Sequence, residues 1–475
     1  RRSPLRLRTN GKQSAQQSNE ICSGSNDRLG IKIHSMILRV TVENLFSFKG
    51  ETQISFVAGK SDKHSSQVCR AEKRDDISVL KASIIYGANA SGKSNIIKAV
   101  ALLQKIALGG VPKNDVEPFK LARLSDMPSK VEMEFKVGTK YYAYGVEFSV
   151  KGITEEWLFE INSRSDMEIY TRKVSADDVF FTFGTYTASD EEKQLVGFIS
   201  KSTPKSDSFL SEYIKRNGKG IRAISDVYRW MRENLKIVFP TTRFEGLSIR
   251  VEKDKQFADA TKSLLEYFNT GIIDIRRVKV AKENVELPKE LVTDILSEAE
   301  PGKGIVVASP SNSEIYFFES DENGMMTIYK QNTIHKGQDD TEVGFEMNEE
   351  SDGSIRIMDF IPILIDLRLN EAVYLIDEID RSMHPMLSQK ILEYYFRYLK
   401  DGKDTQLIFS THESNLLNLN LIRADEVWFV EKDTDGVSHV TSLAEYKPRE
   451  DIRKGYLQGR YGAIPFFAPI NCLKW

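Results

Sequence analysis

Alternating apolar and polar positions mark the first third of the chain and predict β-strands. The side chains there are largely β-branched or aromatic, and glycine marks the turns, at Gly50 and at Gly138. Because two alternating runs joined by a short glycine turn are typical of a hairpin, we expect an antiparallel sheet in this region. The predicted strands are residues 37–48, 53–56, 131–135 and 141–148, with further strands between 157 and 183.

Three short runs that are almost entirely apolar predict strands of another kind, buried on both faces. They cover residues 82–86, 372–376 and 406–409. Each run is followed directly by glycine or by polar residues, which places candidate functional groups at the ends of buried strands. A mixed sheet beside the antiparallel one is therefore expected.

Helical spacing of apolar residues is clearest in two stretches. The first extends from Ile96 to Ile106, where Gly109 follows and ends the pattern, and the second covers residues 190–235. The next stretch, 241–335, gives a mixed pattern without a clear period. Together the patterns predict an α/β fold in which helices flank a mixed sheet, with an antiparallel β subdomain and a largely helical insertion.

The segment between the first apolar run and the first helix is residues 87–94, GANASGKS, which match the phosphate-binding pattern G-x-x-x-x-G-K-[ST]. Glycines allow the backbone N–H groups and the helix N-terminus to face phosphate oxygens. We expect Lys93 to reach the β- and γ-phosphates of ATP, and Ser94 to bind Mg²⁺. An accidental glycine turn is the alternative, but the strand before the segment and the helix after it favour nucleotide binding.

The other two apolar runs end in groups that suit the chemistry of phosphate transfer. Asp377 and Glu378 follow the second run, where Asp377 can hold Mg²⁺ and Glu378 can accept a proton from the attacking water. His412 follows the third run and can contact the γ-phosphate. The alternatives are an acidic turn after a core strand and a structural histidine. The phosphate-binding pattern upstream favours the functional interpretation of both.

Charge and composition limit the remaining options. The chain has 475 residues and a net charge of −3, so contact with nucleic acid requires a local basic patch. Three cysteines without metal or disulfide spacing favour a reducing, cytoplasmic location, and no apolar run is long enough to cross a membrane.

Residues 1–35 are polar and basic, and we expect a leader or a flexible arm outside the fold. Six basic residues in the second helical stretch could meet nucleic acid, an acidic partner or only solvent. They are Lys215, Arg216, Lys219, Arg222, Arg229 and Arg232.

Several segments, in this order, resemble the ABC-type ATPase heads shared by SMC and RecF proteins and the OLD-family ATPases. Residues 42–48 are similar to the opening Asn-Phe-x-x-Phe strand of those heads, and residues 89–95 to their Asn-Gly-x-Gly-Lys-Ser-Asn loop, with Ala90 in place of the glycine. Residues 377–385 resemble the Asp-Glu run that ends in Leu-His-Pro. The resemblance implies that the nucleotide-binding residues are Gly87, Asn89, Ser91, Gly92, Lys93, Ser94 and Asn95.

A serine and a glycine open another predicted helix. Residues 349–354, EESDGS, precede a helical pattern that starts at Ile355, and on their own they would be an ordinary helix cap. They resemble the signature loop of ABC-type ATPases, with Asp352 as a departure at its middle position. The resemblance implies that Ser351 and Gly353 close on the nucleotide of a second subunit. A head-to-head dimer or a higher oligomer is therefore expected.

The narrowest resemblance is to a family of bacterial "AAA" ATPases of the Rlo and AbiL type, found in abortive-infection and restriction-linked loci. It is carried by residues 118–121, 350–353, 410–417 and 456–465. It implies an ATP-hydrolysing subunit that senses phage infection and controls an effector encoded nearby, such as a Toprim-type nuclease. Since too few residues follow His412 for a Toprim domain, we expect the effector to be a separate protein.

Two other functions share the same site residues. A DNA-repair ATPase of the RecF kind would bind DNA tightly, and a binding scaffold would use ATP only to clamp a dimer. A transporter ATPase is disfavoured by the long insertion. The predicted organisation is an N-terminal lobe with the β subdomain at 36–185, a mixed insertion at 186–335 and a C-terminal lobe at 336–475.

Overall fold

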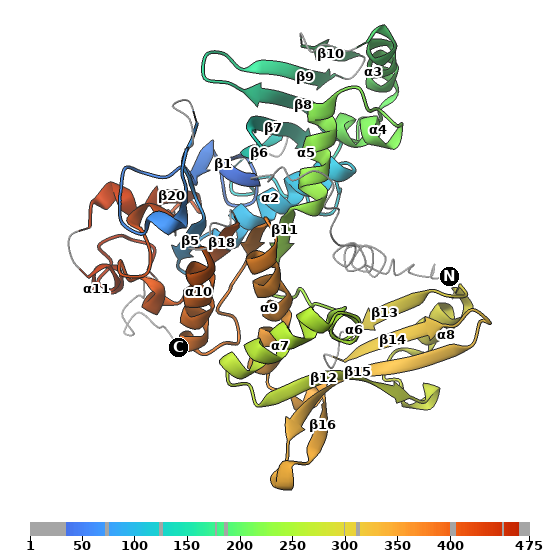
Figure 1. Ribbon diagram of the computed structural model, residues 1–475. Helices are drawn as coiled ribbons and strands as arrows, with labels where there is room; N and C mark the ends of the chain where they lie inside the picture. The colour runs from blue at the N-terminus through green and yellow to red at the C-terminus, as the bar shows by residue number, and fades with distance from the viewer. Residues whose placement is uncertain are drawn as a thin grey trace, which may run out of the picture. The chain divides into compact units, whose positions relative to one another are not determined.

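The computed structural model describes nine stretches of the chain, 35–71, 76–122, 127–175, 178–184, 189–298, 300–309, 314–399, 405–448 and 451–464 (Figure 1). The predicted leader lies outside the described residues except for Ser35, as do Cys22 and Cys472. The chain forms two compact units, which we describe separately. Among the described residues, the larger unit comprises 35–240, 367–380 and 391–464, and the smaller comprises 241–366 and 381–390.

A six-stranded sheet in the larger unit contains the three apolar runs. Its strand order is β11-β17-β18-β5-β19-β20, and every neighbouring pair is parallel except β19 and β20. Because adjacent parallel strands run the same way, the carboxyl ends of β5, β18 and β17 lie together at one edge. The strands are β5 (Ala82–Gly87), β11 (Leu235–Val238), β17 (Val373–Ile376), β18 (Gln406–Ser410), β19 (Val427–Lys432) and β20 (Ser438–Ser442).

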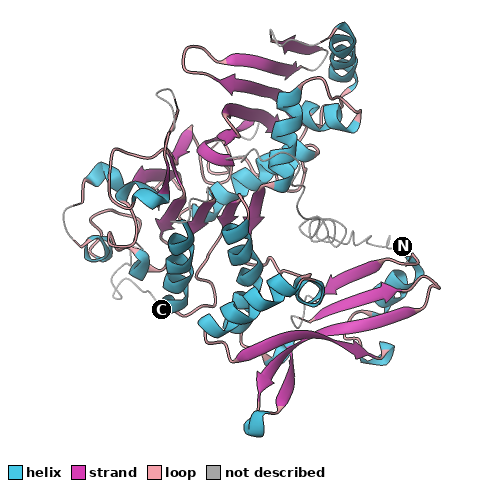
Figure 2. Cartoon of the chain, viewed as in Figure 1, coloured by secondary structure: helices cyan, strands magenta, loops and turns pink. Residues whose placement is uncertain are grey.

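A seven-stranded antiparallel sheet forms the β subdomain of the same unit, as the alternation predicted (Figure 2). The strand order is β10-β9-β8-β7-β6-β1-β2, so all but one of the neighbouring pairs are consecutive in sequence. The strands are β1 (Ser35–Glu43), β2 (Thr52–Ser55), β6 (Ser129–Val137), β7 (Lys140–Ser149), β8 (Gly152–Ile161), β9 (Met167–Val174) and β10 (Val179–Phe183).

One predicted strand is wrong in its second half. The first strand ends at Glu43, and the chain then turns, with Asn44 and Phe46 at left-handed φ angles of 46° and 54°. The turn is closed by paired backbone hydrogen bonds between Leu45 and Phe48. The aromatic composition suggested a strand because Leu45 and Phe48 are apolar, but they are fully buried in the core instead of in a sheet ladder.

Helices α2 and α5 each pack against strands of both sheets in the larger unit. Helix α2 (Lys93–Leu108) begins at the phosphate-binding segment and ends before Gly109, as predicted. The basic stretch forms α3 (Asp190–Ser202), α4 (Phe209–Lys215) and α5 (Arg222–Glu233). Trp230 of α5 stacks on Phe135 of β6 with ring centroids 4.3 Å apart, in a core shared with α2. This packing holds α5 against the β subdomain.

The smaller unit contains a second antiparallel sheet. Its order is β12-β15-β14-β13, and β16 also pairs with β15. Within residues 186–335, the helices up to Glu233 and strand β11 belong to the larger unit, whereas the residues from Thr241 onward belong to the smaller unit. The elements are α6 (Leu247–Lys253), α7 (Lys255–Tyr267), β12 (Ile272–Val280), α8 (Lys289–Glu298), β13 (Gly304–Ala308), β14 (Ile315–Ser320), β15 (Met326–Lys336) and β16 (Glu342–Glu346).

The described residues from 352 onward contain three α-helices. Helix α9 (Asp352–Leu369) starts three residues earlier than predicted, α10 is Pro385–Leu399, and α11 is Ile452–Leu457. The described residues that follow α11, 458–464, form turns and bends. Tyr456 and Tyr461 pack on Phe429 of β19. Within the part of the chain that the structure describes, no helix has the length and apolarity needed to cross a membrane.

Candidate active site

The loop between β5 and α2 needs glycine at both ends. A Cβ atom on Gly87 would lie 2.4 Å from Ser91 Oγ and 2.5 Å from the carbonyl oxygen of Val430. Gly92 has a left-handed φ of 112°, and a Cβ there would lie 2.3 Å from Ser438 Oγ. Both positions therefore exclude any larger residue on packing grounds, independently of any ligand.

Four other residues in or next to this loop have distinct environments. Asn89 is exposed, whereas the Ser91 hydroxyl is buried and has no hydrogen-bond partner among the described residues. Asn95 Nδ2 donates to Ser47 Oγ at 2.8 Å, so its side chain ties α2 to the turn after β1. Ala90 has a left-handed φ of 62° and stands where related loops have glycine. This conformation costs about 1–2 kcal/mol for a residue with a Cβ.

Lys93 is held inside the loop. Its ammonium donates hydrogen bonds to the carbonyl oxygens of Gly87 at 2.8 Å and Ala88 at 2.9 Å. Burial lowers the pKa of Lys93 to about 8, although the nearby carboxylates, led by Asp377 and Glu378, favour the charged form. A buried cation beside several backbone N–H groups is suited to an anionic ligand.

Ser94 and Asp377 meet at the strand edge although they lie 283 residues apart in sequence. The Ser94 hydroxyl donates to Asp377 Oδ1 at 2.9 Å. Asp377 is buried at the end of β17, and Glu378 follows it half-buried with a left-handed φ of 51°. The structure therefore brings together the two residues predicted to bind Mg²⁺, with the predicted base next to them.

His412 reaches the same edge from β18. Its backbone N–H donates to Asp380 Oδ2 at 3.1 Å, which connects the segment after β18 to the segment after β17. Partial desolvation, together with the ammonium of Lys93, lowers the pKa of the His412 imidazole. The lowered pKa favours the neutral imidazole, which can both donate and accept a hydrogen bond.

Sequence reasoning missed two residues of this edge. Ser410, the last residue of β18, donates to Asp377 Oδ1 at 2.6 Å and accepts the N–H of Glu378 at 2.8 Å. Asp380 accepts from His412, as described above. Both lie inside the runs that resemble known families, 377–385 and 410–417. A serine or an aspartate next to a functional residue does not by itself indicate a role, however. Only the pairing of β17 with β18 reveals these contacts.

The other predicted site residues, Ser351 and Gly353, lie in the smaller unit. Ser351 Oγ accepts the N–H of Ser354 at 3.0 Å, which caps the first turn of α9. A Cβ on Gly353 would lie 3.1 Å from the carbonyl oxygen of Ser382. The local contacts are those of a helix cap whose glycine permits a close approach of the backbone after β17.

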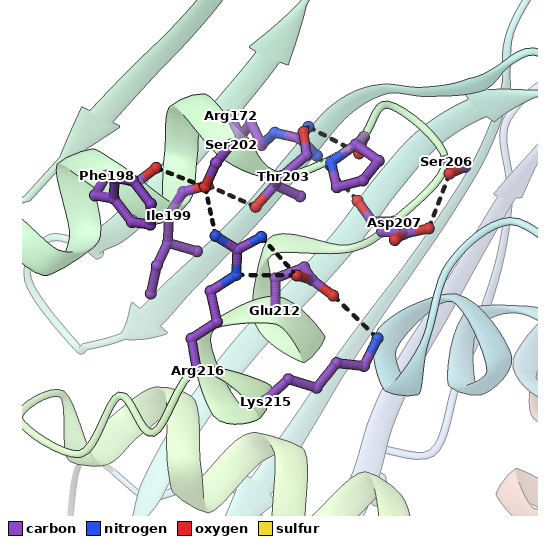
Figure 3. A network of polar contacts seen from close by, with 11 residues as sticks. Arg172, Phe198, Ile199, Ser202, Thr203, Ser206, Asp207, Glu212, Lys215 and Arg216 are labelled. Atoms are coloured by element: carbon purple, nitrogen blue, oxygen red, sulfur yellow. Dashed lines mark hydrogen bonds and ion pairs between the residues drawn. The ribbon is translucent and has the colours of Figure 1, made fainter.

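The basic stretch forms an ion-pair network with residues of its own helices (Figure 3). Glu212 accepts from Lys215 at 3.0 Å and from Arg216 at 3.2 Å, and Arg216 also donates to Ser202. Although burial raises the pKa of Glu212, these two cations hold it below its usual value. Arg222 similarly pairs with Asp226 at 3.3 Å. Three of the six basic residues thus have acidic partners within the chain.

The strand–loop–helix segment and the acidic residues at the end of β17 define a domain of the P-loop NTPase class. Residues 83–418 match the family model described as "AAA domain, putative AbiEii toxin, Type IV TA system", and the chain belongs to this family. The fold class predicted from sequence, a P-loop α/β fold with an antiparallel β subdomain, is confirmed.

Solved structures of SMC heads are also similar to this chain. One is an SmcHead bound to the C-winged helix domain of ScpA, with 14% identity, 86% of this chain and 99% of that chain covered, and a TM-score of 0.37. Another is the SMC head domain from Thermotoga maritima, with 14% identity, 86% and 98% covered, and a TM-score of 0.35. No curated protein matches the chain.

Proposed function

We propose that this chain binds ATP with Mg²⁺ at the carboxyl edge of β5, β17 and β18 and hydrolyses it. The observation that carries the proposal is the hydrogen bond between Ser94 and Asp377, which joins the phosphate-binding loop to the distant acidic pair. A loop that matched the pattern by accident would have no reason to meet a buried aspartate that ends another strand.

The chemistry of the donor set fits Mg²⁺. A hydroxyl and a carboxylate 2.9 Å apart, Ser94 Oγ and Asp377 Oδ1, are hard oxygen ligands of the kind this ion prefers. When bound with ATP, Mg²⁺ would neutralise charge on the phosphates. Lys93 binds the β- and γ-phosphates, Glu378 accepts the proton of the attacking water, and His412 contacts the γ-phosphate. Gly87, Asn89, Ser91, Gly92 and Asn95 form or support the phosphate-binding loop.

The cap of α9 supports a role for a second copy of the chain. Ser351 and Gly353 lie at the N-terminus of α9, and a helix N-terminus attracts phosphate. In the proposed dimer, Ser351 and Gly353 of each chain complete the site of the other. ATP would then hold two heads together, and hydrolysis would release them, which makes a switch.

The family description includes a toxin of a toxin–antitoxin system, and this supports a role in bacterial antiphage defence. In this role the ATPase senses infection and controls a partner effector, a nuclease or another toxin encoded nearby. DNA repair and an ATP-clamped scaffold remain the alternatives. A repair ATPase would be stimulated strongly by DNA, and a scaffold would turn over ATP negligibly with any partner.

Two measurements test the proposed ATP hydrolysis and the proposed defence role separately. Purified protein should release phosphate from ATP in the presence of Mg²⁺ and lose this activity in excess EDTA. The ATPase proposal would be contradicted if no Mg²⁺-dependent release occurred, whether the chain was alone or with the protein encoded by its neighbouring gene. For the defence role, cells expressing the chain alone or with its neighbouring gene are challenged with phage. We expect protection only from the pair, and protection by the chain alone would contradict a separate effector.

A further inference from the structure

The hydroxyl of Ser410 connects the two acidic residues of the proposed ATPase site. Ser410 ends β18 and is fully buried. Its Oγ atom lies 2.6 Å from Asp377 Oδ1 and 2.8 Å from the backbone nitrogen of Glu378. A hydroxyl has one hydrogen to donate, and the backbone N–H of Glu378 can only donate. The directions are therefore fixed, since Ser410 donates to the carboxylate and accepts from Glu378.

The backbone at Glu378 explains why such a contact is needed. Glu378 has a φ of 51°, a left-handed conformation that a residue with a side chain adopts only where its surroundings hold it. The Ser410 hydroxyl holds its N–H, and the Ser410 carbonyl oxygen accepts the N–H of Ile379 at 3.1 Å. Two consecutive backbone groups of the acidic turn are thus bound by one residue of the neighbouring strand.

The carboxylate of Asp377 is oriented by the same hydroxyl. Oδ1 accepts from Ser410 on one side and from Ser94 on the other, at 2.6 Å and 2.9 Å. A chain of hydrogen bonds therefore runs from β18 through Asp377 to the first turn of α2. Hydrogen bonds that orient a metal ligand typically affect metal affinity or activity by 10- to 100-fold when removed.

We propose that Ser410 is a positioning residue that fixes the Asp377 carboxylate and the Glu378 backbone relative to each other. Asp377 needs a defined orientation to hold Mg²⁺, and Glu378 needs a defined position to reach the attacking water. One hydroxyl supplies both. This inference rests on the proposed ATPase function, and it assigns to Ser410 no contact with the substrate.

The test compares two serines buried in neighbouring strands of one sheet. Ser83 of β5 is also fully buried, and its hydroxyl makes no hydrogen bond to any residue that the structure describes. We expect Ser410→Ala to lower kcat by about 10- to 100-fold, to change KM for ATP by less than about twofold, and to raise the Mg²⁺ concentration for half-maximal rate. Ser83→Ala should leave all three unchanged.

A second readout does not depend on turnover. Affinity for a fluorescent ATP analogue is measured in EDTA and in Mg²⁺ by equilibrium titration. The gain in affinity caused by Mg²⁺ should shrink in Ser410→Ala and persist in Ser83→Ala. Should Ser410→Ala not fold, Ser410→Cys keeps the side-chain volume while weakening both hydrogen bonds, and the same losses are expected.

The outcomes separate this inference from the proposed function. Wild-type kcat and Mg²⁺ dependence in Ser410→Ala, or in Ser410→Cys if that variant alone folds, would overturn the positioning role and leave the ATPase intact. Equal losses in Ser410→Ala and Ser83→Ala would also overturn it, because they would report a general packing defect. No Mg²⁺-dependent hydrolysis by the wild-type protein would remove the proposed function, and the inference with it.

Discussion

The strand edge at β5, β17 and β18 and the basic helices α4 and α5 were both candidate binding regions in the sequence. They differ in the partners of their basic side chains. At the strand edge, Lys93 is buried, and among the described residues its ammonium donates hydrogen bonds to the backbone carbonyl oxygens of Gly87 and Ala88. In the basic helices, Lys215 and Arg216 share the carboxylate of Glu212 within one helical turn (Figure 3). The first cation is placed for a ligand, and the other two already have a partner.

The difference also appears in sequence distance. Contacts at the strand edge join residues 283 and 33 positions apart, whereas Glu212 lies three and four positions from its cations. Local pairs of this kind are typical of a solvated helix surface and contribute little stability. Long-range contacts between polar groups at the ends of buried strands are costly to maintain without a function. The comparison therefore supports the proposed chemistry at the strand edge and a structural role for Lys215 and Arg216.

The largest effect is expected from Glu378→Gln. The amide keeps the shape of the side chain but cannot accept the proton of the attacking water, so kcat should fall by about 10²- to 10⁴-fold. ATP affinity should be unchanged. The measurement is phosphate release at saturating ATP. The control is Glu413→Gln, since Glu413 is an acid next to His412 whose carboxylate accepts the N–H of Asn415 at 2.8 Å. Wild-type turnover in Glu378→Gln would show that another group is the base.

A smaller effect is expected at His412. Removing the imidazole in His412→Ala should lower kcat by about 10- to 100-fold, because one contact to the γ-phosphate is lost while the others remain. His439→Ala is the matched control, since His439 lies on β20 and pairs with Asp433 at 2.8 Å. The measurement is the steady-state rate of ATP hydrolysis. Equal rates for both variants and the wild type would show that His412 has only a structural role.

The basic helices should give almost no effect on nucleic-acid binding. We expect the double variant Lys215→Ala, Arg216→Ala to change the affinity for duplex DNA by less than about twofold and to lose less than about 1 kcal/mol of stability. Binding is measured at low and moderate salt. A tenfold loss of affinity, with a shallower salt dependence than the wild type, would instead show contact with the phosphate backbone.

The smallest effect concerns the stability of the phosphate-binding loop. Ala90→Gly relieves a left-handed conformation but increases the entropy of the unfolded chain, so the free energy of unfolding should rise by about 0–1 kcal/mol. Ala88 has no left-handed φ, so Ala88→Gly should lower the free energy of unfolding by about 0.5–1 kcal/mol. Denaturant titration measures both. The opposite order of the two variants would contradict the conformation assigned to Ala90.

The same contrast explains what sequence could predict. The buried strands β5, β17 and β18 and the helix α2 were predictable because apolar runs and helical spacing reflect burial directly. The turn at Asn44–Phe48 was not, since aromatic residues favour strands and a phenylalanine such as Phe46 gives no sign of a left-handed φ. Only Asn44 is of a residue type that adopts this conformation readily. The helix α11 was missed because six residues carry too little periodicity.

The candidate site shows a similar limit. Lys93, Ser94, Asp377 and Glu378 were predictable because their chemistry requires those residue types at fixed places. Ser410 and Asp380 were not, because a hydroxyl or carboxylate that supports another residue can lie anywhere that strand pairing brings it close. The pairs Lys215–Glu212 and Arg216–Glu212 could have been inferred from their helical spacing, which favours ion pairs.

The most direct test of the central claim, that the strand edge is an ATP site, is calorimetric titration of a non-hydrolysable ATP analogue into two lysine variants of helix α2. Lys93 is the buried first residue of α2, and Lys98 is exposed on the next turn of the same helix. The account predicts saturable binding in the wild type and in Lys98→Ala, and at least a 100-fold weaker affinity in Lys93→Ala. Equal affinities in Lys93→Ala and Lys98→Ala would contradict the claim.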